Sequence, residues 1–344
     1  MKCMILGKCL EMKISISRLI NYNKIRHNRL IDLVNIEYCN SGADVINLYI
    51  DLNSLLRSIY GQDIAIEDYL ELTSSIINLC GFYRSFFRRY YDVHTRIYIV
   101  YSNNTPPDNI TIYPEYNSKN KKMIDANKYV TSYIAKTLNL LDTICPYIPD
   151  VQFCIDYCET GVIIQYLKEL QTKNFIPNIV LSRDPYNFQL VDDNTKVLVP
   201  YKERDVSGNI VDSSYFATLQ NAIYFYCLKN KSILPVEYSD INGYYLPLFM
   251  AISRCPQRNI KSINKITKAL NMLRDIDLAN KVKSDVLLQN RYYVCDIRQQ
   301  LETYRISPSK HIITAEISNL YNKEEIQNLN NKYFSKYPLE LESL

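Results

Sequence analysis

Acidic side chains follow several apolar segments of this sequence, at positions where a catalytic or metal-binding site can form. Asp51 follows the apolar run VINLYI, Glu159 opens a helical pattern after a strand predicted at 151–155, and Asp184 follows NIVLSR. The carboxyl ends of the strands in a parallel sheet meet at one crevice, so we expect these three carboxylates to converge there. Three acids can hold one hard cation such as Mg²⁺. The alternative for each acid alone is a helix cap or a solvated position, since Asp favours helix N-termini.

The remaining positions at this predicted crevice are not acidic. Ser102 follows the segment RIYIVY, and Cys255 lies on a later loop. Two-metal phosphodiester cleavage needs ions about 3.5–4 Å apart, flanked by more carboxylates than the three available here. The residue types therefore favour either one ion or none.

Strands and helices alternate through the first two thirds of the chain. The expected strands and helices are 45–51, 67–90, 96–102, about 123–141, 151–155, 158–171 and 178–182, with a helical pattern from about 215 onward. This order predicts an α/β fold with three layers, in which a mainly parallel central sheet is covered by helices on both faces.

We expect three regions along the chain. Residues 1–40 read as an N-terminal extension, 41–263 as the α/β domain, and 264–344 as a helical C-terminal region. Within the domain, residues 103–122 mix Pro, Asn and Lys with few apolar residues, which predicts an exposed excursion that proteases cut early.

Composition excludes some classes of protein and site. The 344 residues carry a net charge of +4, and no apolar run approaches the roughly 18 residues of a membrane span. Ten scattered Cys and three distant His predict free thiols in a reducing compartment and no zinc site. The abundance of Asn, Ile and Tyr suggests an AT-rich genome, as in many viruses and phages. We therefore expect a cytoplasmic protein, or a virion protein if the source is viral, without a membrane partner.

The order of the segments resembles the 5′-3′ exonuclease and flap endonuclease family of the PIN-like superfamily, over roughly residues 45–275. YIDLNSLLRSIYG resembles the family's opening strand with its aspartate at Asp51, and YCETGVIIQYL resembles the helix with an acidic pair, of which Glu159 is the first. LSRDPYNFQLV resembles the strand with two aspartates, of which Asp184 is the first. IYPEYNSKNKK resembles the arch segment, and AISRCPQRNIKSI resembles the loop that opens the helix-hairpin-helix.

Several acids that the resemblance implies are replaced. Other residue types stand where it places acids, at Ser102, Gly161, Tyr186, Cys255 and Arg258. Arg183 and Arg254 lie beside two of the motif positions. A guanidinium paired with a carboxylate can neutralise it in place of a metal ion, although an arginine at the surface is the plain alternative.

Three hypotheses follow. The first is a pseudoenzyme: a catalytically inactive nuclease fold without a cofactor, which binds DNA or serves as a structural protein in a viral or phage assembly. The second is a reduced Mg²⁺- or Mn²⁺-dependent 5′-3′ exonuclease or flap endonuclease that uses Asp51, Glu159 and Asp184. The third is an unrelated fold in which the order of the motifs is a coincidence.

Two basic segments are candidates for nucleic-acid contact. Arg88 and Arg89 lie in FYRSFFRRYY, and Lys119, Lys121 and Lys122 lie in the arch-like segment. Arginines with aromatic neighbours can contact phosphates and stack on bases. For 82–91 we favour the alternative of an amphipathic helix, with aromatic side chains in the core and arginines reaching solvent.

Overall fold

The computed structural model describes residues 44–56, 69–102, 128–156, 158–171, 176–204, 207–208, 210–229, 241–253 and 263–303, together with residues 324, 327, 328 and 331. The expected N-terminal extension at 1–40 and the excursion at 103–122 lie outside these ranges. In the described part of the chain, no helix is both long enough and apolar enough to cross a bilayer.

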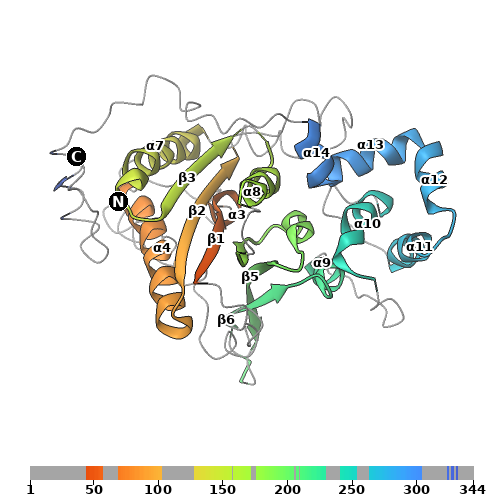
Figure 1. Cartoon of the computed structure of the whole chain (residues 1–344), viewed down its shortest axis with the longest axis horizontal. Helices are drawn as coiled ribbons and strands as arrows, with labels where there is room; N and C mark the ends of the chain where they lie inside the picture. The colour runs from red at the N-terminus through yellow and green to blue at the C-terminus, as the bar shows by residue number, and fades with distance from the viewer. Residues whose placement is uncertain are drawn as a thin grey trace, which may run out of the picture.

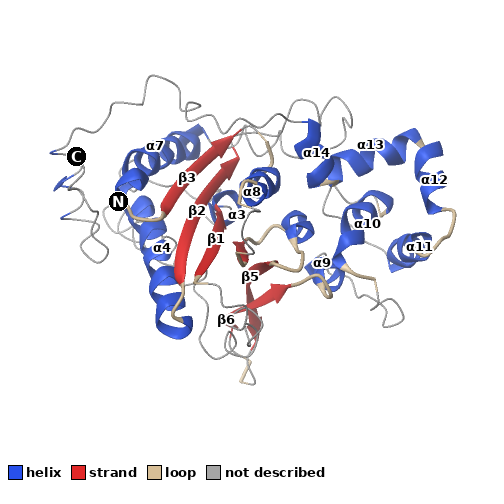
Figure 2. Ribbon diagram, in the orientation of Figure 1, coloured by secondary structure: helices blue, strands red, loops and turns tan. Residues whose placement is uncertain are grey.

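A six-stranded sheet forms the centre of the molecule, in the order β3-β2-β1-β4-β5-β6 (Figures 1 and 2). The five strands from β3 to β5 run parallel, and β6 is antiparallel to β5. The strands are β1 Val45–Asp51, β2 His94–Ser102, β3 Val151–Asp156, β4 Asn178–Leu181, β5 Thr195–Arg204 and β6 Ile210–Ala217. The predicted α/β class with a mainly parallel sheet is confirmed.

Helices cover both faces of the sheet. One face carries α3 (Leu52–Leu56), α4 (Tyr69–Tyr91) and α7 (Lys128–Ile144), and the other carries α8 (Thr160–Glu169) and the 3₁₀ helix η4 (Pro185–Leu190). Side chains along the strands alternate between these two layers, as a period of two requires. In β1, Leu48 and Ile50 join the first layer, while Tyr49 faces the second and stacks on Tyr98 at 5.0 Å between ring centroids.

The hairpin of β5 and β6 differs from the sequence prediction, which placed no strand after 178–182 and a helical pattern from about 215. β6 extends to Ala217, and the first helix beyond it is α9 (Ala222–Lys229). Pro200 and the charged residues after it obscured β5, because proline interrupts a strand pattern. The buried run Val197, Leu198 and Val199 is the part of β5 that crosses the core.

The remaining helices lie to one side of the sheet, to the right of it in Figure 1. They are α10 (Leu246–Ile252), α11 (Ile263–Leu273), α12 (Leu278–Ser284), α13 (Val286–Cys295) and α14 (Ile297–Thr303). The predicted helical character from about 264 is confirmed for the described residues 263–303.

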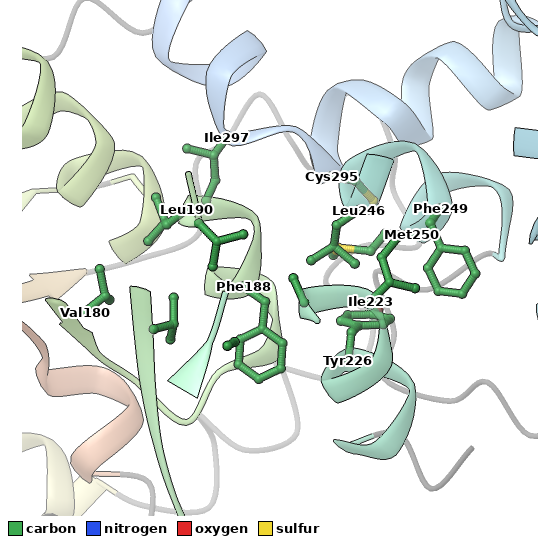
Figure 3. Close-up of a cluster of buried hydrophobic side chains, with 14 of the residues drawn as sticks. Val180, Phe188, Leu190, Ile223, Tyr226, Leu246, Phe249, Met250, Cys295 and Ile297 are labelled. Carbon is green, nitrogen blue, oxygen red and sulfur yellow. The ribbon is translucent and has the colours of Figure 1, made fainter. Parts of the chain in front are cut away.

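A single hydrophobic cluster joins these helices to the sheet. Figure 3 shows its centre, where side chains from the sheet layer and from the later helices lie next to one another. Its members include Val180 in β4, Phe188 and Leu190 in η4, Ile223 and Tyr226 in α9, Leu246, Phe249 and Met250 in α10, Cys295 in α13 and Ile297 in α14. The C-terminal helices therefore share a core with the α/β layers.

Candidate functional site at the carboxyl ends of the strands

Asp51 is the last residue of β1 and is almost completely buried, with 1% of its surface exposed. Its Oδ1 accepts a hydrogen bond of 3.0 Å from the backbone N–H of Ser54, so the side chain caps the first turn of α3. Its Oδ2 accepts from Ser182 Oγ at 2.6 Å and from Asn187 Nδ2 at 2.8 Å. Both oxygens of this carboxylate are therefore used by donors of the protein itself.

Ser182 connects Asp51 to the segment that follows β4. The Ser182 hydroxyl accepts hydrogen bonds of 3.0 Å from the backbone N–H of Asp184 and from Asn187 Nδ2. The neighbouring Arg183 donates its backbone N–H to Ser54 Oγ at 3.0 Å. The ends of β1 and β4 are thereby held together by one buried polar network.

Asp184 lies at the start of η4 and is partly exposed. Its Oδ1 accepts a hydrogen bond of 3.1 Å from the backbone N–H of Tyr186, which makes Asp184 the cap of this helix. This is the role that a single acid at a strand end takes most often.

Glu159 and Gly161 belong to the start of α8. Glu159 is the N-cap residue and is partly exposed, but its side chain does not cap the helix. A Cβ atom added to Gly161 would lie 2.4 Å from Ile297 Cδ1 and 2.6 Å from Asn187 Oδ1. The space beside Gly161 is therefore filled, and no larger side chain fits there without displacing these atoms.

Tyr186 stands where the resemblance places the second aspartate of the β4 motif. Its hydroxyl accepts a hydrogen bond of 2.8 Å from Nε2 of the fully buried Gln300. Burial raises the pKa of the Tyr186 hydroxyl well above its usual value, and the nearby Glu159 charge raises it further. Tyr186 is therefore a neutral contact to α14, and cannot supply the charge of the missing acid.

Ser102 ends β2 and is paired with Asn53 of α3. The Ser102 backbone N–H donates to Asn53 Oδ1 at 2.7 Å, and Asn53 Nδ2 donates to the Ser102 carbonyl at 2.8 Å. In the sheet register Ser102 lies opposite Asp156, the last residue of β3. Asp156 is an acid at this edge that sequence reasoning did not select.

The metal ions that the resemblance implies do not fit the residues that the structure describes. Both Asp51 oxygens are directed to protein donors, and the position of Gly161 is closed. Among the described residues, no three His, Cys, Asp or Glu side chains lie together in a group that can hold a metal ion. The strand ends bring Asp51, Glu159 and Asp184 to one end of the sheet without forming such a group.

The remaining predicted residues lie elsewhere. Arg88 and Arg89 are exposed near the end of α4, which leads into the start of β2, so they lie toward the amino ends of the strands, at the opposite end of the sheet from Asp51 (Figure 1). Aromatic side chains of the same helix are buried, as at Tyr83 and Phe87, which agrees with the amphipathic-helix interpretation. Six predicted residues fall outside the described ranges: Lys119, Lys121, Lys122, Arg254, Cys255 and Arg258.

Sequence reasoning missed the residues that hold this site together. Ser182 ends a predicted strand and Ser54 lies in the first turn of the helix that follows another, so their positions carried a signal. Asn187 stands inside the quoted motif PYNFQLV, but nothing in its spacing indicates a bond to Asp51. Ile297 and Gln300 carry no signal at all, because they reach the site from the distant C-terminal region.

Solved structures of other proteins share the overall fold of this chain. A crystal structure of the bacteriophage T5 D15 protein, co-crystallised with metal ions, matches over 84% of this chain and 98% of its own, with 11% identity and a TM-score of 0.50. The chain therefore has the α/β 5′-nuclease fold of this protein. The hypothesis of an unrelated fold is therefore wrong.

Other solved proteins resemble this 5′-nuclease fold at lower scores. A complex of the bacteriophage T5 D15 flap endonuclease with DNA and metal ions covers 84% of this chain and 98% of its own, at 11% identity and a TM-score of 0.49. Human GEN1 in complex with Holliday junction DNA covers 87% of this chain and 70% of its own, at 10% identity and 0.39. No family model matches the chain. No curated protein sequence matches it either.

Proposed function

We propose that this chain is a catalytically inactive 5′-nuclease fold that binds DNA, and that it acts as a component of a viral or phage assembly. The observation that carries the proposal is the state of Asp51. This carboxylate is 1% exposed, and three donors of the protein occupy both of its oxygens. An ion would have to compete with these donors for a carboxylate that is shielded from solvent, whereas metal-assisted hydrolysis depends on ions held by accessible acidic groups beside the phosphate.

DNA is the ligand class that the fold supports. The T5 D15 flap endonuclease has been crystallised with DNA and metal ions. DNA binding draws most of its affinity from phosphate contacts and does not require cleavage. The candidate basic residues are Arg88, Arg89, Lys119, Lys121 and Lys122, of which the two arginines are exposed on α4. A purely structural role in the assembly is the competing proposal.

A reduced Mg²⁺-dependent nuclease is the second candidate function. Glu159 and Asp184 are both partly exposed at the same end of the sheet, which is the observation in its favour. Such an enzyme could hold one ion with these two carboxylates, water and the substrate phosphates, and the use of Asp51 as a further ligand would require it to leave its buried network.

The test is incubation of the purified protein with flap, nicked and single-stranded DNA in Mg²⁺ and in Mn²⁺, beside an Asp184→Ala variant. We expect no cleavage by either protein, together with DNA retention that weakens steeply as salt rises. Cleavage that disappears in Asp184→Ala would overturn the proposal and support the reduced nuclease. Absence of both cleavage and retention would leave the structural role.

A further inference from the structure

The C-terminal helix α14 contacts η4, next to the carboxyl ends of the strands, through a group of linked hydrogen bonds. Gln300 Nε2 donates to the Tyr186 hydroxyl at 2.8 Å and to the Val294 carbonyl at 2.9 Å. Gln189 completes the set, since its Oε1 accepts from the Ile297 backbone N–H at 2.9 Å and its Nε2 donates to the Tyr186 carbonyl at 2.9 Å. Hydrogen bonds between donors and acceptors of the two elements thus join the start of α14 to η4.

An apolar contact extends the same interface to α8. Ile297 is 2% exposed and lies next to Leu190 in the shared core (Figure 3). Its Cδ1 occupies the space where Gly161 has no side chain. Asn187 closes the other side of that space and cannot rotate freely, because its Nδ2 bonds both Asp51 and Ser182.

Two of these contact positions are ones where the resemblance places acids. Gly161 lacks the side chain that would collide with Ile297, and Tyr186 supplies a neutral hydroxyl where a carboxylate would stand. An aspartate at 161 would meet the same two atoms, Ile297 Cδ1 and Asn187 Oδ1. The replacements therefore serve the contact with α14 and exclude an ion from the same place.

We propose that residues at the carboxyl ends of the strands form an internal docking socket for α14. The socket consists of Gly161, Tyr186, Asn187 and Gln189, and α14 occupies it through Ile297 and Gln300 in place of metal ions. This proposal goes beyond the inactive-nuclease function, because it assigns a positive structural role to the residues that replace the acids. It rests on contacts, and does not depend on any assay of cleavage.

The first test is the sign of the effect of Gly161→Ala. Alanine ordinarily stabilises a helix relative to glycine, because it restricts the unfolded chain and has the highest helix propensity. In an occupied socket the added Cβ meets Ile297 and Asn187, and overpacking of a tight core destabilises. We expect Gly161→Ala to lower the melting temperature by roughly 2–6 °C. A rise in melting temperature would overturn the proposal.

The matched control removes one of the two colliding atoms, Ile297 Cδ1, and leaves Asn187 Oδ1 in place. Ile297→Val deletes Cδ1 and retains Cγ1, which lies 3.3 Å from the position of the added Cβ at Gly161. We expect Gly161→Ala to lower the melting temperature less in the Ile297→Val protein than in the native protein, since contacting residues deviate from additivity. Equal effects in the two backgrounds would contradict the socket.

Manganese binding supplies a second readout. We expect Gly161→Asp to lower the melting temperature and to leave uptake of Mn²⁺, followed by electron paramagnetic resonance of the free ion, no higher than in the native protein. A Gly161→Asp protein that keeps the native melting temperature and takes up Mn²⁺ would overturn the socket. Cleavage of DNA by the native protein would overturn the proposed function and leave these measurements unaffected, so the two failures are distinguishable.

Discussion

The Asp51 carboxylate is stabilised by hydrogen bonds from three neutral groups, the Ser54 amide, the Ser182 hydroxyl and the Asn187 side-chain amide. Hydrogen bonds to a charged group contribute more than those between neutral groups, at about 1.5–3 kcal/mol each. The three donors belong to α3, to the end of β4 and to η4, so this one side chain connects three elements. Its role in the folded protein is therefore to hold the strand ends together.

We predict that Asp51→Ala lowers the free energy of unfolding by about 3–5 kcal/mol, because it leaves buried donors without an acceptor. The measurement is urea unfolding followed by circular dichroism. Asp193→Ala, at an exposed position in the turn before β5, is the control and should change stability by less than about 0.5 kcal/mol. A gain in stability in Asp51→Ala would instead indicate repulsion among acids arranged for an ion.

The sequence predicted where the acidic residues lie but not which residues contact them. The positions of Asp51, Glu159 and Asp184 at the ends of elements followed from apolar runs and helix-start signals, which are local. The bond from Asn187 to Asp51 joins residues 136 positions apart. No periodicity encodes that pairing, because it depends on how the segment after β4 turns back over β1. The filling of the space at Gly161 by Ile297 was hidden for the same reason.

At the scale of elements, α8 is fixed to the connection between β4 and β5 by a buried ion pair. Lys168 Nζ lies 2.8 Å from Asp192 Oδ2 and donates to the Leu190 carbonyl at 3.0 Å, with the Lys168 side chain 7% exposed. Burial lowers the pKa of Lys168, against the opposing effect of Asp192. Burial raises the pKa of Asp192, but the Lys168 charge and several hydrogen bonds outweigh it, so the net shift of Asp192 is downward.

The lowered pKa of Asp192 predicts a dependence of stability on pH. Since this carboxyl has a lower pKa in the folded than in the unfolded protein, its contribution is complete above the ordinary value of 3.8 and is lost as the pH falls through the folded value. We expect Asp192→Asn to lower the free energy of unfolding by about 1–3 kcal/mol at pH 7, and by progressively less below pH 3.8.

Urea unfolding at a series of pH values from neutral to strongly acidic measures this difference. Asp193→Asn, which changes the neighbouring exposed acid, controls for general charge effects. A difference between Asp192→Asn and the native protein that stays constant down to the lowest pH would show that the Asp192 charge does not contribute through this pair.

The sequence predicted some of the helices and strands and missed others. The helix over Tyr69–Tyr91 and the first four strands follow from long apolar patterns and end close to the predicted residues. The sequence did not predict the β5–β6 hairpin, because Pro200 and the polar stretch after it weaken the alternation of apolar and polar residues that identifies a strand. Pairing with β4 and β6, which the local sequence does not reveal, decides the conformation there.

For the whole molecule, the two faces of the sheet have different partners. The first core lies between the sheet and α4 with α7, and the second continues from the sheet into α10, α11, α13 and α14. Because the C-terminal helices contribute to the second core instead of forming one of their own, their loss would expose the apolar side chains of α8 and η4 that pack against them. The predicted boundary near residue 264 marks a change in secondary structure, and we propose that it is not a boundary of folding.

A core substitution in α11 provides the last prediction. Leu270 is fully buried in the second core, so Leu270→Ala should lower the free energy of unfolding by about 2–5 kcal/mol.

Cys80 in the first core and Cys295 in the second are both buried, and burial raises the pKa of the Cys80 thiol to about 12, so each thiol reacts only after opening. In low concentrations of urea, pulsed thiol labelling read by mass spectrometry should report the same loss of stability at both cysteines, since we expect the two cores, which pack on opposite faces of one sheet, to unfold as a unit. Leu287→Ala, at a position that is 49% exposed on α13, is the control and should change neither rate. Faster labelling of Cys295 with unchanged protection of Cys80 would show that the helices beyond residue 264 unfold separately from the sheet.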